Sequence, residues 1–330
     1  GPTLSLRENN LQLTGSNPQM NQNGAGPVTN YISIELTTNV TLGGAGGGTM
    51  TFAGVLTGSG SLTKTNGGTL TIPVAHSHSG GTVVLGGTLN PHGNGSGASL
   101  NYFGTGTLTL TNGVTLRPTD ASGQPVRFAN PVTLSGGTVS VPIPFGGGTD
   151  LRLDGVVSGP GGFSISGGTR GLSLHGSNTF SGGVTLNDGN RVHILNVNGL
   201  GTGPLTLGNA SGGSLNPSAN LSAGLVTNSI NLAAGGTLSV DTGAGSVNLA
   251  GSIANTGALT KSGVNTLTLS GVNTHSGNTT VNAGSLALSN SLALQNSTLV
   301  FGANGTLAFG GSLTPLTLGA LSGSTAVPLV

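Results

Sequence analysis

Residues 249–288 read LAGSIANTGALTKSGVNTLTLSGVNTHSGNTTVNAGSLAL, and residues 52–91 read FAGVLTGSGSLTKTNGGTLTIPVAHSHSGGTVVLGGTLNP. The two stretches align without a gap at a constant offset of 197 residues. Leu62-Thr63-Lys64, for example, falls on Leu259-Thr260-Lys261. Self-similarity over tens of residues indicates a scaffold of stacked units, in which each unit buries its apolar face against its neighbours.

Two further copies show how the chain is organised. A third copy occupies residues 153–192, and the stretch from Leu318 reads as the start of a fourth. We therefore predict a β-helix over residues 47–330, with copies near 52–91, 153–192 and 249–288 and a partial copy from 318. Residues 1–46 do not follow the repeat. We predict that they either cap the first coils or dock on the terminal coil of another copy, which would make a head-to-tail fibre.

Short alternating runs inside the copies predict the secondary structure. Apolar and small polar residues alternate with period two, which places one set on each face of a strand. Gly, Asn, Ser or Asp punctuate nearly every run, and no window shows sustained helical spacing. Such runs include Leu70-Thr71-Ile72, Leu172-Ser173-Leu174 and Leu267-Thr268-Leu269. Strands of three to five residues without crossover helices predict an all-β, elongated parallel β-solenoid with apolar residues inside and Thr, Ser and Asn outside.

Composition excludes several function classes. The 330 residues include 64 Gly and 15 Pro, yet the apolar residues keep their period, which a disordered tract has no reason to do. Only 8 basic and 7 acidic residues are present, so no cluster suits nucleic-acid binding. No apolar run approaches the ~20 residues of a membrane span, and no signal peptide is visible at the start. The absence of cysteine suits a chain exported unfolded.

At this point the residues carry a resemblance to a family. The pattern L-T-K-x-G-x-x-T-L-T-L-x-G-x-N-T-x-S-G-x-T-x-V-x-x-G-x-L at Leu259–Leu286 resembles the autotransporter-associated β-strand repeat of bacterial surface proteins. The resemblance covers roughly a third of the chain. It implies a single-stranded right-handed parallel β-helix, export, and an extracellular or cell-surface structural role. Within residues 1–330 we expect no C-terminal membrane barrel of the kind that a full autotransporter has, as for a fragment or for a repeat protein that uses another export route.

Two acidic residues and one basic residue are the best candidates for catalysis in a sequence with few charged residues. Asp150, Arg152 and Asp154 alternate along DLRLD and would point to one face of a strand. Acidic clusters that hold calcium beside a basic residue occur in polysaccharide-cleaving β-helices. The alternative, which we favour, is a solvated ion-paired face beside buried Leu151 and Leu153. We predict no catalytic residue, no cofactor and no metal site.

Repeated histidines and lysines have the same choice between chemistry and packing. His76 and His78 share a strand face in AHSHSG, and two imidazoles at this spacing can chelate a metal. However, Phe180 holds the slot of His78 and His275 in the middle copy, which favours a packing position. Lys64 and Lys261 also occupy equivalent slots. We expect them on the outer edge, where a lysine blunts unwanted strand pairing.

The sequence therefore predicts a non-enzymatic, extracellular structural or adhesive rod or fibre segment at a bacterial cell surface. Its expected partners are further copies of itself, head to tail or laterally, or components of a cell surface or matrix. The alternative is a polysaccharide-acting β-helix enzyme. Ice or flat-lattice binding through threonine rows is disfavoured, because Thr-x-Thr pairs do not recur at a constant short period.

Overall fold

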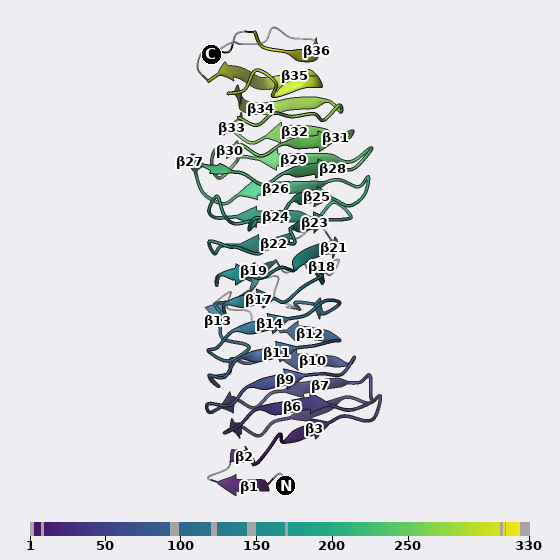
Figure 1. The fold of residues 1–330 in the computed structure, drawn as a ribbon, viewed down its shortest axis with the longest axis vertical. Coiled ribbons are helices and arrows are strands. Elements are labelled where there is room, and N and C mark those ends of the chain that lie inside the picture. Colours follow the sequence, from purple (N-terminus) through teal and green to yellow (C-terminus); the bar gives the residue numbers. More distant parts are fainter. Residues whose placement is uncertain are drawn as a thin grey trace. The chain divides into compact units, whose positions relative to one another are not determined.

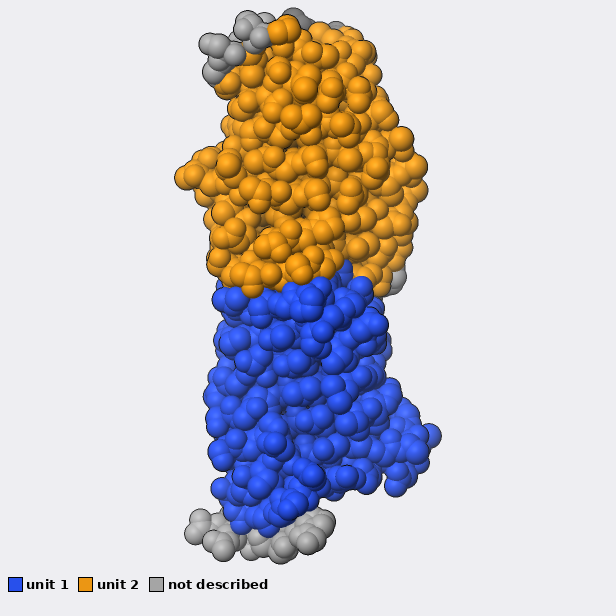
Figure 2. Space-filling view, in the orientation of Figure 1, with its two compact units in different colours: residues 1–163 blue, residues 164–330 orange. Residues whose placement is uncertain are grey.

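The computed structural model describes residues 3–7, 10–92, 99–119, 124–143, 150–168, 171–310, 313 and 315–323. These residues form strands β1 to β36 and no helix, and the strands stack in parallel as a β-solenoid (Figure 1). The predicted all-β solenoid is thereby confirmed. The chain divides into two compact units, residues 1–163 and 164–330, which Figure 2 colours separately.

Unit 1 winds through four ladders, which are parallel except for the antiparallel β1–β2 pair. Each strand pairs with the strand one coil earlier and one coil later, so side chains at equivalent positions stack. The first ladder is β1 (Thr3–Arg7), β2 (Asn10–Thr14), β5 (Ile34–Leu36) and β8 (Leu56–Thr57). The second is β3 (Gln19–Asn21), β6 (Val40–Gly43), β9 (Leu62–Lys64), β11 (Thr82–Val84), β14 (Leu108–Leu110), β17 (Val132–Leu134) and β20 (Val157–Ser158).

The other two ladders of unit 1 complete its coils. One is β4 (Val28–Asn30), β7 (Thr49–Phe52), β10 (Thr69–Ile72), β12 (Thr88–Pro91), β15 (Thr115–Leu116) and β18 (Thr138–Ile143). The other is β13 (Ser99–Leu100), β16 (Val126–Phe128) and β19 (Leu151–Leu153).

Unit 2 repeats the plan. One ladder is β21 (Gly162–Gly167), β23 (Val184–Leu186), β25 (Leu205–Leu207), β28 (Ile230–Leu232) and β31 (Ile253–Asn255). The second is β22 (Gly171–Leu174), β24 (Arg191–Ile194), β26 (Gly213–Pro217), β29 (Thr237–Asp241), β32 (Ala258–Ser262) and β34 (Thr279–Leu288). The third is β27 (Leu221–Val226), β30 (Val247–Leu249) and β33 (Thr266–Leu269), which also joins β34. Strands β35 (Leu294–Phe309) and β36 (Leu318–Gly323) follow.

Alternation explains the core. Strands such as β14, β17 and β23 bury their two outer residues and leave the central Thr half-exposed. In register, Leu70 pairs with Leu89 and Leu89 with Leu116, so leucines form an inward column. Burying one such leucine is worth about 1.5–3 kcal/mol relative to leaving it in water. The core is therefore a stack of small apolar layers, one for each coil.

Two features differ from the sequence expectation. Strands β34 and β35 run for 10 and 16 residues, because the backbone stays extended around a corner with an irregular register at Val281/Ala283. Threonines also stack despite their uneven spacing: Thr49, Thr69, Thr88 and Thr115 are successive Cα partners. Insertions are absorbed in the connections between strands, so an irregular period in sequence still gives a regular column in space.

The predicted boundary at residue 46 crosses regular coils. Within residues 10–46, β2 pairs in parallel with β5 and β3 with β6, and β4 pairs across the predicted boundary with β7. Strand β1 pairs with β2 in antiparallel register, unlike the parallel ladders around it. A capping or docking role for residues 1–46 stays a prediction.

Candidate functional site

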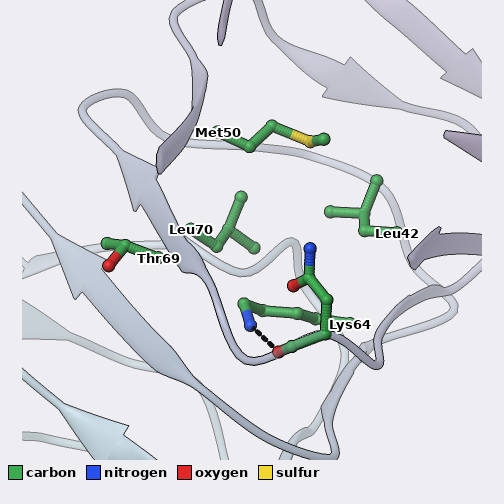
Figure 3. A pocket seen from close by; sticks show the side chains of 6 residues that line it. Leu42, Met50, Lys64, Thr69 and Leu70 are labelled. Carbon is green, nitrogen blue, oxygen red and sulfur yellow. Dashed lines mark hydrogen bonds between the residues drawn. The ribbon is translucent and has the colours of Figure 1, made fainter. Parts of the chain in front are cut away.

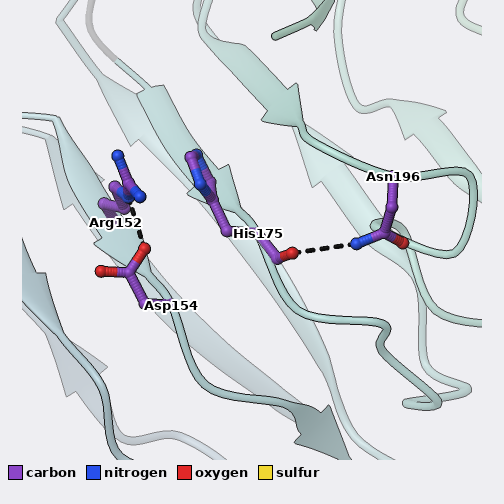
Figure 4. A network of polar contacts seen from close by, with 4 residues as sticks. All are labelled: Arg152, Asp154, His175 and Asn196. Carbon is purple, nitrogen blue, oxygen red and sulfur yellow. Dashed lines mark hydrogen bonds and ion pairs between the residues drawn. The ribbon is translucent and has the colours of Figure 1, made fainter. Parts of the chain in front are cut away.

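The outward face of β19 carries the acidic and basic candidates. Leu151 and Leu153 are buried, and Arg152 points outward between them, as the alternation predicts. The Nε of Arg152 donates to Asp154 Oδ1 at 2.5 Å, and both side chains are less than one-third exposed (Figure 4). Arg152 is the Cα partner of Arg127 in the previous coil. The arrangement is an ion pair on a polar face, which contributes about 0–1 kcal/mol when solvated.

Metal chemistry finds little support in this part of the chain. Among the described residues, no group of three or more His, Cys, Asp or Glu side chains lies close enough to hold a metal ion. Asp150 stays half-buried beside β19 and takes no part in such a group. The Arg152–Asp154 pair thus places one positive and one negative charge side by side on the outward face.

The two repeated lysines point inward, and the expected outer-edge position is wrong. Lys64 on β9 is 2% exposed and Lys261 on β32 is fully buried. Each ammonium donates to backbone carbonyls at a coil corner. Lys64 Nζ reaches Asn66 O at 2.5 Å and Gly86 O at 2.8 Å (Figure 3). Lys261 Nζ reaches the carbonyls of Ser262, Gly263 and Ala283 at 2.8, 2.7 and 2.8 Å.

Lys64 and Lys261 each link two consecutive coils through hydrogen bonds. One carbonyl partner of each lysine lies 22 residues further along the chain, which is one coil later. Burial lowers the pKa of both Lys64 and Lys261 to about 8, and the Asp241 carboxylate acts in the opposite direction on Lys261. Leu42, Met50, Thr69 and Leu70 surround Lys64 in a hollow with no interior room for a water molecule (Figure 3). A substrate could not reach this amine, so its role is structural.

His76 fills a slot that asparagine holds in the other copies. Its Nδ1 accepts a hydrogen bond from the Leu56 backbone N–H at 3.2 Å. In the copy at 249–288, Asn273 Oδ1 accepts from the Ile253 N–H at 2.8 Å, and Asn273 Nδ2 donates to Ala293 O. The imidazole therefore imitates the amide oxygen, but His76 Nε2 is buried without a hydrogen-bond partner among the described residues.

Asparagines perform the same task elsewhere. Buried Asn178 donates to Gly199 O, and Asn228 donates to the carbonyls of Gly201 and Gly203. On the outer side of a turn, Asn196 Nδ2 donates to His175 O at 2.9 Å (Figure 4). Each amide replaces a missing backbone partner where a coil turns, which removes the cost of a buried unpaired carbonyl.

His78 and His275 each pair with a buried threonine four residues later. Thr82 donates its hydroxyl to Phe103 O at 3.0 Å, so it accepts from His78 Nε2 at 3.1 Å. The proton of neutral His78 therefore resides on Nε2. His275 Nε2 contacts Thr279 Oγ1 at 2.9 Å, and Thr279 lies 2.8 Å from Ser297 Oγ.

The hydrogen bonds that begin at His275 end at the backbone carbonyl of Gly277. Ser297 Oγ donates to Gly277 O at 2.6 Å. The proton order is therefore His275 to Thr279 to Ser297 to Gly277 O. All three side chains are buried.

In the middle copy both partners change together. Phe180 takes the His slot and Val184 takes the Thr slot, and both are buried. The ring in this slot packs against a left-handed glycine of the next coil. A Cβ at Gly104 (φ +79°) would lie 2.8 Å from His78 Nδ1, and one at Gly201 (φ +67°) would lie 2.9 Å from Phe180 Cδ1. The slot is a packing position that accepts either a matched polar pair or a matched apolar pair.

His76 and His78 are not arranged as a pair of metal ligands. Both residues lie in the connection between β10 and β11 and not on a strand face as expected, and their ring centroids are 6.2 Å apart. The Nε2 of His78 is occupied by Thr82, and Gly104 closes on its Nδ1. Desolvation lowers the pKa of His76 to about 3, helped by His78, and lowers the pKa of His78 and His275 to about 4. All three are neutral near pH 7.

The chain is similar to a bacterial repeat family and to part of one curated protein. The model of the passenger-associated transport repeat matches residues 62–90, 171–190 and 259–288, each inside one of the copies. A curated relative, the adhesin BmaC autotransporter of Brucella suis biovar 1 (strain 1330), is 33% identical over 168 residues. The match covers 45% of this chain and 5% of the relative, so the chain spans a small part of that relative's length. No solved structure matches the chain.

The matched stretches contain the inward features described above. Residues 62–90 and 259–288 include both buried lysines and both His–Thr pairs, and 171–190 includes Phe180 and Val184. No described helix is long and apolar enough to cross a membrane. Parallel coils, three repeat matches and similarity to an autotransporter adhesin agree with the sequence pattern at Leu259–Leu286. Three stretches of this chain thus match the repeat model of autotransporter passengers, and they lie within a parallel β-solenoid.

Proposed function

We propose that this chain is an extracellular β-helical segment that provides structure and adhesion at a bacterial cell surface. The single observation that carries the proposal is the set of three passenger-associated transport repeats within a parallel solenoid. Similarity to a stretch of an autotransporter adhesin supports adhesion as the activity. The proposal assigns no chemical reaction to the chain.

The outer faces suit a surface for contact. Their strands present Thr, Ser and Asn at half-exposed positions, as in the columns of Thr41, Thr63 and of Thr109, Thr133. Hydroxyl and amide groups both donate and accept hydrogen bonds. Because partner groups on successive coils are ~4.8 Å apart, a bound surface can be contacted repeatedly along the ladder.

A cell-attachment assay tests the proposal. Beads coated with the purified chain are expected to attach to host cells or matrix-coated wells above beads coated with an unrelated β-solenoid of similar size. Export is tested separately on intact bacteria that express the natural protein, where an antibody against this segment is expected to bind before lysis. Attachment at the level of the unrelated solenoid would overturn the adhesive role, and labelling only after lysis would overturn the cell-surface location.

Self-association is a second part of the proposal, and strand β36 is the observation that favours it. In the described residues β36 pairs with β35 only, and nearly all of its residues are exposed. Leu321 pairs in register with buried Leu299, yet it is 61% exposed. An exposed edge strand with an apolar side chain in core register is a template for another strand.

Sedimentation velocity over a concentration series tests this part. The wild-type chain is expected to form larger species as concentration rises, and Leu321→Lys is expected to stay monomeric. Thr317→Lys serves as a matched control that adds the same charge just before the strand. A wild-type chain that is monomeric at all concentrations would overturn self-association while leaving adhesion standing.

A further inference from the structure

A hollow of about 210 Å³ opens on the outer face of unit 2 and is lined by polar groups of three successive coils. Its lining residues are His193 of β24, Asn216 and Pro217 of β26, Ser218, Asp241 of β29 and Ala244. Strands β24, β26 and β29 are neighbours in one ladder (Figure 1). The function proposed above assigns no role to this hollow, which we call the β24–β29 hollow.

Strand register explains why these side chains meet. His193 and Asn216 are Cα partners. Leu215 pairs with Val240, so the residues that follow them, Asn216 and Asp241, lie next to each other on the outward face. An imidazole, an amide and a carboxylate thus stand in one column, about 4.8 Å apart from coil to coil. The column Thr49, Thr69, Thr88 and Thr115, by contrast, offers hydroxyl groups alone, so the β24–β29 column presents a wider set of hydrogen-bonding groups.

A buried acceptor in the wall points to a bound molecule. Asn216 Oδ1 is buried and receives no hydrogen bond from the described residues. A buried carbonyl oxygen without a donor is unfavourable, and a ligand hydroxyl or an ordered water is the usual remedy. Asp241 Oδ1 is held by the Gly243 N–H at 3.0 Å, so the carboxylate is fixed in orientation at the rim.

The rim beside the hollow is built irregularly. Just beyond Ser218, Gly245 packs so closely on Ala219 that a Cβ there would lie 2.3 Å from the Ala219 oxygen. The chain then enters β27, which opposes six residues to the three of β30 and shifts register between Leu221 and Val226. Leu225 in this bulge is 52% exposed. Bulges are found preferentially next to functional sites, where they redirect side chains.

We propose that the β24–β29 hollow binds one uncharged sugar ring of a surface polysaccharide or glycan. The proposal rests on the adhesive function, because it names the chemical class that the surface would contact. The hollow is smaller than the ~300–1,000 Å³ clefts that hold drug-sized ligands, so it suits a single ring. Sugar hydroxyls donate to Asp241 and to Asn216 Oδ1, and they accept from amide, imidazole and Ser218 donors.

Charge favours an uncharged ligand. The lining contains one carboxylate and no lysine or arginine, which disfavours an anionic sugar. The Asp241 carboxylate already interacts with the buried Lys261 ammonium, which weakens its attraction for a cationic ligand. Pro217 and Ala244 supply the apolar patch of the lining in place of an aromatic wall. With few contacts and no stacking ring, we expect a dissociation constant on the order of 1 mM.

Ligand-observed NMR on the full chain tests the proposal. Glucose, galactose and mannose are the probes, and glucuronate and methylguanidinium are the anionic and cationic comparisons. We expect saturation transfer to at least one neutral sugar and little to either charged compound. Stronger binding of methylguanidinium than of every neutral sugar would overturn the proposal in favour of a site for a basic side chain.

Matched variants locate the binding. Asn216→Ala and Asp241→Asn are expected to lower the affinity at least ~10-fold. Asp241→Asn keeps an oxygen to accept from Gly243, so the local turn is preserved. Ser239→Ala is the control, since Ser239 lies outward two residues earlier on β29 and outside the hollow. Equal binding by wild type and by both hollow variants, with unchanged circular dichroism, would overturn the proposal.

A parallel bead assay distinguishes failure of the sugar site from failure of the adhesive function. If wild-type beads attach and the hollow variants attach equally, the sugar site fails while adhesion stands. If wild-type beads do not attach, but neutral sugars still bind in the hollow, the adhesive function fails and the site stands.

Discussion

Exchange of the polar pair His275/Thr279 for the apolar pair Phe/Val gives the sharpest test of the buried slots. The middle copy already contains that exchange as Phe180 and Val184. Each single change, however, leaves one partner behind. His275→Phe removes the donor to Thr279 Oγ1, and Thr279→Val leaves the buried His275 Nε2–H without an acceptor.

The structure gives the size of the effect. An orphaned buried donor or acceptor costs about 1–3 kcal/mol, so each single variant should lose about that much local stability. The double variant removes both members of the pair, while Ser297 keeps its donation to Gly277 O, and replacing both members by apolar groups of fitting shape is nearly neutral. The expected coupling between the two sites is therefore about 2–6 kcal/mol in favour of the double variant, because it equals the two single losses together.

Amide hydrogen exchange read by mass spectrometry measures this locally. A tenfold change in protection corresponds to about 1.4 kcal/mol, so peptides across residues 270–300 should lose protection by about 5- to 150-fold in each single variant. The double variant should regain most of it. Peptides around His78 and Thr82 in unit 1 are an internal control and should not change.

The reciprocal exchange sharpens the test. Phe180→His alone should lower protection around residues 175–200, and Phe180→His with Val184→Thr should restore part of it. Losses in the double variant at 275/279 that equal the sum of the single losses would refute the reasoning that the two positions form one unit.

Four further outcomes follow from the buried polar groups. Lys261→Ile introduces the residue type that the middle copy has at the equivalent position, Ile165, but it leaves three backbone carbonyls without their donor. We expect the free energy of unfolding to fall by about 2–4 kcal/mol in chemical denaturation. Lys64→Ile, with two carbonyls, should lose less, and equal losses would contradict the count of hydrogen bonds. His76→Asn should stabilise the chain by about 1 kcal/mol, because the amide keeps the acceptor for Leu56 N–H and removes the orphaned Nε2; a lower melting temperature would argue against the equivalence with Asn273. Stability should fall as the pH drops from about 6.5 toward 4, because His78 and His275 have a folded-state pKa of about 4 and are protonated at higher pH in the unfolded chain. Each histidine contributes up to about 3 kcal/mol to this loss. A denaturation midpoint that does not change over this pH range would contradict the burial of neutral histidines.

The repeating pattern predicted most of the fold, because strand periodicity is a local property. Leu70, Leu172 and Leu267 are buried where the alternation places them, and Thr71 and Thr268 lie on the outer face. Repeat copies also showed that His78, Phe180 and His275 share one packing slot. Local alternation needs no knowledge of distant contacts, which is why it could be recognised.

The lysines could not be placed in the same way. Their inward position depends on carbonyls at coil corners, and one partner of each lies 22 residues away. Nothing in the LTK triplet shows where those carbonyls point. A signal was nevertheless present: Ile165 occupies the equivalent slot, and an aliphatic residue in place of lysine is more consistent with burial than with an edge.

The histidine partners were missed for a different reason. Thr82 and Thr279 lie four residues after the ring, across a turn that no strand or helix pattern describes. The exchange of His with Thr for Phe with Val within one chain is the signal that could have identified the pair. The β24–β29 hollow had no such signal, because His193, Asn216 and Asp241 meet only through the register of three coils.

The stapled corners also determine how the chain responds to pulling. Asn273 accepts from Ile253, 20 residues earlier, and donates to Ala293, 20 residues later. Tension along the stack must therefore break one such tie before a coil opens, and the next tie then takes the load. A freed coil of about 20 residues can extend to roughly 70 Å, against the ~4.8 Å that it occupies when folded. If the chain tethers a cell as proposed, the tether would lengthen in discrete steps under flow, and each step would dissipate energy and limit the rise of force on the attachment.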